Sequence, residues 1–90
     1  MRTIHAVVTG TVQGVGFRYR TQRKARQLGL TGWVRNQTDG SVEVLAQGPN
    51  DAVTHLASFL EEGPPGATVT AIEVTERVTD PDLDRFEITF

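Results

Sequence analysis

Residues 8–21 read VTGTVQGVGFRYRT, and this stretch sets the plan of the chain. Its β-branched start is typical of a strand, its glycines predict a tight loop, and the residues from Arg18 onward have helical spacing. A loop that runs directly into a helix directs backbone N–H groups and the positive end of the helix dipole toward one point. We therefore expect this loop to bind an anion.

The residue types in the loop favour a small phosphate-like anion. Gly10, Gly14 and Gly16 permit positive φ angles and place no Cβ in the path of a ligand. Arg18 adds a planar, permanently charged fork that matches pairs of phosphate oxygens. The loop lacks the Gly-Lys-Ser/Thr ending of nucleotide-binding loops and is shorter than the dinucleotide fingerprint. A glycine turn without any ligand is the alternative.

Composition limits the chain to a few classes of protein. Ninety residues predict one small domain, residues 1–90. The absence of cysteine excludes disulfides, thiolate chemistry and cysteine zinc sites. The sequence has neither an apolar run long enough to span a membrane nor a signal-peptide pattern. We expect a cytoplasmic protein with no membrane association.

Charge is distributed unevenly along the sequence. Residues 1–36 contain seven basic side chains and no acidic one, whereas the rest of the chain contains two basic and eleven acidic side chains. The glycine loop lies in the basic part, whose field attracts small anions. The alternative is that Arg20, Arg23, Lys24 and Arg26 only form the solvated face of a helix.

The predicted elements follow the split βαβ plan of the ferredoxin-like fold, an α+β class with two helices on one face of an antiparallel sheet. The Asp39-Gly40 pair predicts a hairpin between the second and third strands. The expected elements are a strand at Ile4–Thr9, a helix at Arg18–Leu28, strands at Thr31–Gln37 and Ser41–Gln47, a helix at Asn50–Glu62, a strand at Thr68–Val78 and a short terminal strand in residues 86–90.

Aromatic and histidine side chains are expected to have structural roles. Phe17 and Tyr19 are interpreted as packing residues, and Trp33 is expected to cover one face of the sheet. His5 has no carboxylate or second histidine near it in sequence, so it too is interpreted as structural. His55 falls on the polar side of the second helix, where we expect it to be exposed to solvent.

The topology brings one polar residue to the loop. In this fold the first two strands run parallel through a right-handed helical crossover, with the third strand between them. Their carboxyl ends share one edge of the sheet, about 10 Å apart. Arg35 and Asn36 end the second strand, and Asn36 is the neutral polar group best placed to face the loop. A turn-forming role for this asparagine is the alternative.

The sequence resembles a known family. VTGTVQGVGFRYRT and GWVRNQTDGSVEV resemble the central motifs of acylphosphatases, which hydrolyse carboxyl-phosphate mixed anhydrides. GPPGATVTAIEV and FEITF resemble later segments of the family, so the resemblance covers nearly the whole chain. Ser41 is a mild departure, because threonine is frequent there in relatives.

The resemblance implies roles for individual residues. Arg18 would bind the phosphate through its guanidinium, and Asn36 would orient the attacking water. The backbone of residues 13–18 would cradle the phosphate; these residues are Gln13, Gly14, Val15, Gly16, Phe17 and Arg18.

The chemistry of an acyl phosphate fits a site without a general acid. No acidic residue precedes Asp39, and neither histidine has an expected place at the loop. The leaving carboxylate has a conjugate acid with a pKa near 4, so it leaves without being protonated. Holding the phosphoryl group, stabilising its charge and aiming a water are then sufficient. Alkyl phosphates, whose leaving groups need a proton, should be poor substrates.

Two other functional classes share features with this sequence. RNA-recognition domains share this strand order but stack bases on aromatic residues of the first and third strands, which IHAVVTG and SVEVLAQ lack. A non-catalytic, anion-sensing regulatory module is the other alternative. We expect a monomer that binds no nucleic acid and needs no cofactor or metal, with a small acyl phosphate as substrate and inorganic phosphate as product and inhibitor.

Overall fold

In the computed structural model, which describes residues 1–90, strand β1 (Arg2–Thr11) is an interior strand of a five-stranded sheet. It pairs antiparallel with β3 (Val42–Gly48) and with β4 (Thr68–Arg77). Strand β2 (Thr31–Asn36) pairs antiparallel with β3 and parallel with β5 (Phe86–Ile88). The order is β4-β1-β3-β2-β5. The ferredoxin-like fold is thus confirmed, with one difference: β5 makes the sheet mixed rather than purely antiparallel.

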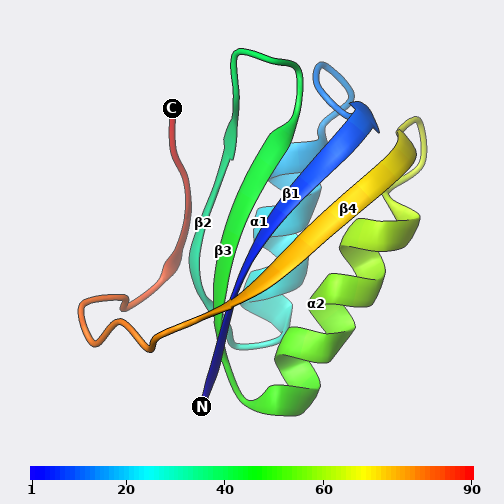
Figure 1. Ribbon diagram of the computed structural model, residues 1–90. Coiled ribbons are helices and arrows are strands. Elements are labelled where there is room, and N and C mark those ends of the chain that lie inside the picture. The colour runs from blue at the N-terminus through cyan, green and yellow to red at the C-terminus, as the bar shows by residue number, and fades with distance from the viewer.

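Helices α1 (Phe17–Gln27) and α2 (Asn50–Glu62) cover the same face of the sheet (Figure 1). The bounds of α2 are those expected, and α1 is displaced by one residue toward the N-terminus. Gly29 follows α1 with a φ of +74°, as expected for a helix-ending glycine. Both apolar stripes face the sheet, where the alternate residues of the strands complete the core. The largest buried side chains include Phe17, Phe86, Ile4, Leu56, Leu60 and Val8.

Three segments that are distant in sequence meet at one end of the sheet. Strand β3 lies between the parallel strands β1 and β2, so the loop after β1 (residues 12–16) and the β2–β3 turn (residues 37–41) emerge at the same edge. Figure 1 shows this loop and turn together at the top of the molecule, with the C-terminus on the same side. The predicted topology therefore positions the end of β2 beside the glycine loop.

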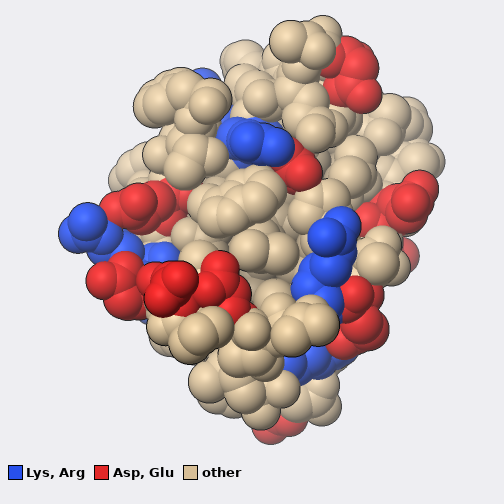
Figure 2. Space-filling view, turned by 60° about the vertical axis from the view of Figure 1, so that its left-hand side comes forward, with Lys and Arg blue, Asp and Glu red and all other residues tan.

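One group of acidic side chains lies away from the glycine loop, in the segment between β4 and β5. Figure 2 shows them around the segment that joins β4 to β5, residues 78–85, which contains Asp80, Asp82 and Asp84. As expected, His55 is exposed. Neither helix has the length and apolarity needed to cross a membrane.

Candidate active site

The loop between β1 and α1 presents a row of unpaired backbone donors. Gly14 and Gly16 have φ angles of +75° and +76°, which confirms that this turn uses the left-handed conformation that glycine permits. None of the N–H groups of residues 13–19 donates a hydrogen bond to another protein atom. Helix α1 also begins without a side-chain cap and without an acidic residue in its first turn. Backbone donors and the helix dipole are therefore available to one anion.

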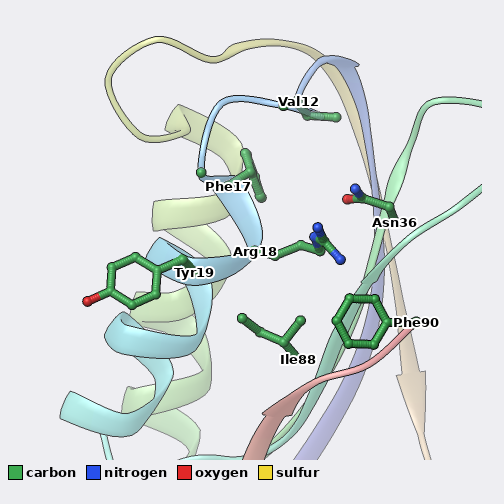
Figure 3. A pocket seen from close by; sticks show the side chains of 9 residues that line it. Val12, Phe17, Arg18, Tyr19, Asn36, Ile88 and Phe90 are labelled. Atoms are coloured by element: carbon green, nitrogen blue, oxygen red, sulfur yellow. The ribbon is translucent and has the colours of Figure 1, made fainter.

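Arg18 is the only charged residue of the pocket in front of this loop. Its side chain extends from the first turn of α1 toward Asn36 (Figure 3). It forms no ion pair with a carboxylate, and its guanidinium carbon lies 5.3 Å from the centre of the Phe90 ring. A guanidinium without an anionic partner is available to bind a ligand.

Asn36 is the last residue of β2, and its side chain points into the same pocket. Its Oδ1 atom is buried and has no hydrogen-bond partner in the protein. A buried polar atom without a partner costs free energy, and such atoms are rare in folded proteins. The amide is therefore available to a group that enters the pocket. Topology brings Asn36 and Arg18 together, as the sequence predicted.

The pocket has a volume of about 240 Å³ and combines this polar end with apolar walls (Figure 3). Sequence reasoning missed the wall from the C-terminal segment, because it assigned that segment only to sheet pairing. The parallel pairing of β5 with β2 carries the chain to the edge where Asn36 lies. The lining residues are Val12, Gly14, Gly16, Phe17, Arg18, Tyr19, Asn36, Ile88 and Phe90.

Some residues near the loop differ from their expected roles. Gly10, with a φ of +135°, lies at a bulge where β1 passes close to Thr68, not in the pocket. Phe17 is buried as expected, whereas Tyr19 is 59% exposed at the pocket rim, so its interpretation as a packing residue was wrong. The Gln13 side chain donates hydrogen bonds to the β2–β3 turn. Its backbone N–H donates to no protein atom and is therefore available to a ligand.

The other basic residues of α1 lie outside this pocket. Arg20, Arg23 and Lys24 line a separate hollow of about 230 Å³ with Phe59, Pro64 and Pro65. None of them forms an ion pair, so they leave α1 positively charged. They contribute to the field around the loop but do not line the pocket that contains Arg18 and Asn36.

A second polar cluster lies on the face of the sheet away from the helices. His5 Nε2 lies 2.6 Å from Glu43 Oε2, and Arg35 Nε lies 2.5 Å from Glu43 Oε1. Burial alone would raise the pKa of Glu43, but hydrogen bonds from His5 and Arg35 and their charges outweigh burial, so this pKa is lowered. Trp33 completes the cluster, since its ring stands edge-on to His5. His5 is structural as expected, but β3 supplies the carboxylate that its sequence neighbours lack.

Fold and site together define a small α+β domain whose strand-loop-helix junction gathers unpaired backbone donors, one arginine and one asparagine around a single pocket. The acylphosphatase family model matches residues 4–88. The acylphosphatase of Alkalilimnicola ehrlichii is 61% identical over 69 residues, which cover 77% of this chain and 78% of that protein. The acylphosphatase of Paraburkholderia xenovorans is 48% identical over 87 residues, covering 97% and 90%. The crystal structure of acylphosphatase from Bacillus subtilis superposes with a TM-score of 0.95 at 42% identity, and each chain is covered completely.

The chain belongs to the acylphosphatase family. It is accordingly an enzyme that hydrolyses acyl phosphates, and family membership favours this function over a non-catalytic, anion-sensing module.

Proposed function

We propose that the loop holds the phosphoryl group of an acyl phosphate, that Arg18 binds its oxygens and that Asn36 orients the water that attacks phosphorus. The observation that carries this proposal is the row of unpaired N–H groups at residues 13–19, most of which belong to residues that line the pocket of Arg18 and Asn36. Fixed donors of this kind need no reorganisation when charge develops on the phosphoryl oxygens.

Arg18 supplies the only positive charge that lines the pocket. Its fork can bind two phosphoryl oxygens while the loop amides bind the third, so charge on all three equatorial oxygens is stabilised in the transition state. Asn36 Oδ1 accepts a hydrogen bond from the attacking water and aims a lone pair of that water at phosphorus. An amide cannot remove the proton of the water, so this proton passes to a phosphoryl oxygen or to solvent.

The same arrangement limits the substrates. The leaving carboxylate is stable as an anion, so acyl phosphates react without a general acid, whereas alkyl phosphates bind but react slowly. Inorganic phosphate shares the group that the loop recognises and acts as a competitive inhibitor. The proposed enzyme is a monomer that works in the cytoplasm. It needs neither metal nor cofactor, because Arg18 and the loop amides supply the positive charge that stabilises the transition state.

Benzoyl phosphate hydrolysis tests these roles. Arg18→Ala should lower kcat/KM about a hundred- to a thousandfold and raise the inhibition constant for phosphate, since it removes a charged donor. Asn36→Ala should lower kcat by a similar factor with less effect on phosphate inhibition, since the amide acts on the water.

The matched control is Arg20→Ala, which removes a neighbouring cation of α1 that does not line the pocket and should change kcat less than threefold. EDTA should leave the wild-type rate unchanged. Full activity in both Arg18→Ala and Asn36→Ala, or a pH-rate profile with an essential enzyme base titrating between about 5 and 8, would overturn the proposed roles.

A further inference from the structure

The side chain of Gln13 connects the two halves of the site. Its Nε2 atom donates both hydrogens to backbone carbonyls of the β2–β3 turn, one to Gln37 O at 2.7 Å and one to Ser41 O at 2.9 Å. Gln13 directly precedes Gly14, the first glycine of the loop, and Gln37 directly follows Asn36. These two bonds therefore join a residue of the proposed phosphate cradle to the turn that directly follows Asn36.

Gln13 makes the only hydrogen bonds between the loop and a separate element. Apart from the bond of Arg20 N to Gly16 O within the start of α1, residues 12–16 form no other hydrogen bond and no ion pair. The loop is otherwise held by apolar packing, through the buried Val12 and the partly buried Val15. Apolar contacts are non-directional, so they do not fix how far the loop lies from β2.

The turn at the other end of these bonds is rigid. Ser41 O also accepts a hydrogen bond from Gln37 N at 2.9 Å, and Gln37 O accepts one from Gly40 N at 3.2 Å. Ser41 N donates to Asp39 Oδ1 at 2.9 Å, which fixes the turn from within. Gln13 thus connects a loop that forms few hydrogen bonds to a turn that is fixed by several.

We propose that Gln13 is a positioning residue whose side-chain amide ties the phosphate loop to the β2–β3 turn and so sets the distance between the bound phosphoryl group and Asn36. This inference rests on the function proposed above. A water oriented by Asn36 must lie in line with a phosphorus atom held by the loop, so a small shift of one half relative to the other misaligns the attack. Misplacement of about 1 Å can cost a hundredfold in rate.

The experiment compares Gln13→Met, which keeps the length of the side chain and loses both donors, with Gln22→Met. Gln22 is a matched control because its side-chain amide also donates to a backbone carbonyl, that of Phe86 at 3.4 Å, but links α1 to β5. With benzoyl phosphate, Gln13→Met should lower kcat about ten- to a hundredfold. The inhibition constant for phosphate should change less than about threefold, because the loop amides and Arg18 remain. Gln22→Met should keep the wild-type kcat.

A double-mutant cycle separates positioning from general stability. If Gln13 acts through Asn36, Gln13→Met should cost much less in an Asn36→Ala background than in the wild type. Equal losses in the two backgrounds, or a lowered melting temperature with unchanged kcat of the folded protein, would overturn the proposal.

A second readout does not depend on activity. Addition of phosphate should shift the side-chain amide resonance of Asn36 in the wild type, and Gln13→Met should reduce this shift at saturating phosphate. An inert wild type would contradict the proposed function and leave this readout intact. An identical Asn36 shift in both proteins would contradict the positioning role alone.

Discussion

At the scale of single residues, the site depends on polar groups that the protein leaves without partners. Arg18 forms no ion pair, and the carbonyl oxygen of Asn36 is buried without a hydrogen bond. The buried oxygen of Asn36 costs the folded state free energy that a hydrogen-bonding ligand would recover, whereas Arg18 is only partly buried and remains solvated until a ligand binds. The open sheet face shows the opposite arrangement, because both carboxylate oxygens of Glu43 there have partners.

The contact between Arg18 and Phe90 should hold the guanidinium near its binding orientation. Phe90→Ala removes a cation–π contact worth about 0.5 to 1 kcal/mol at an exposed position, which corresponds to a two- to fivefold rise in the inhibition constant for phosphate. Val78→Ala is the control, since Val78 is 90% exposed and does not line the pocket. Unchanged inhibition in Phe90→Ala, or an equal rise in both variants, would show that the ring does not act on Arg18.

Glu43 should make folding stability depend on acid pH. The pKa of Glu43 is lowered from 4.5 because hydrogen bonds and charge from His5 and Arg35 outweigh its burial. A lowered folded-state pKa stabilises the protein above the unfolded-state pKa, and this contribution disappears as pH falls through the folded-state pKa. Glu43→Gln should cost about 1.5 to 3 kcal/mol at pH 7, with the difference from wild type shrinking below about pH 4.5.

Urea unfolding of Glu43→Gln and wild type between pH 7 and pH 3 measures this difference. Glu87→Gln removes an exposed ion pair with Arg85 and should change stability by less than about 1 kcal/mol at every pH. A pH-independent loss in Glu43→Gln would mean that the ionised carboxylate is not the stabilising group.

At the scale of elements, the glycines of the first strand and its loop serve different purposes. Gly14 and Gly16 face open space, so their requirement is the backbone conformation that presents the amides. Gly10 is required by packing as well, because a Cβ there would lie 2.1 Å from Thr68 O on β4. The same residue type therefore shapes the backbone of the loop at Gly14 and Gly16 and permits the β1–β4 contact at Gly10.

Gly10→Ala should destabilise the protein more than a glycine substitution in open space. Its φ of +135° alone costs a side chain about 1 to 3 kcal/mol, and β4 must also move away. Gly40→Ala is the control, because Gly40 has a φ of +93° but no atom within 4 Å of a Cβ. Thermal unfolding of both variants measures the difference, and equal melting temperatures would contradict the packing role of Gly10.

At the scale of the whole molecule, the fold brings together segments that lie far apart in sequence. The loop comes from the first crossover, Asn36 from the end of β2, and Ile88 and Phe90 from the C-terminal segment. Charge is divided as well, since α1 contains basic and no acidic side chains, whereas acidic side chains gather at the segment between β4 and β5 (Figure 2). The positively charged helix thus begins at the pocket that contains Arg18 and Asn36.

Phosphate should stabilise the folded molecule because only the folded state assembles this pocket. At a hundred times the dissociation constant a ligand contributes about 2.7 kcal/mol, which raises the melting temperature of a chain of this size by roughly 10 to 20 °C. Differential scanning fluorimetry in phosphate, against sodium chloride of equal ionic strength, measures the shift. Arg18→Ala should show a smaller shift at the same phosphate concentration, and an identical shift would place phosphate elsewhere.

Most elements could be predicted because their signals are local. The spacing of Val53, Leu56 and Leu60 specifies a helix with one buried face, and the Asp39-Gly40 pair specifies the hairpin that places Asn36 at the end of β2. Gly14, Gly16 and Arg18 lie within five consecutive residues, so their proximity could be predicted from the sequence alone. The parallel pairing of β5 could not be predicted, because three residues carry no signal for the direction of pairing.

The sequence alone determined the order of the elements, the glycine conformations and the identity of the charged and amide groups, because these depend on neighbours along the chain. Tertiary structure decided which distant groups meet. His5 acquired Glu43 from β3, Gln13 acquired the carbonyls of Gln37 and Ser41, and Arg18 acquired the Phe90 ring. Such contacts depend on side-chain packing across strands, and no local pattern of residues encodes the partner that a side chain will meet there.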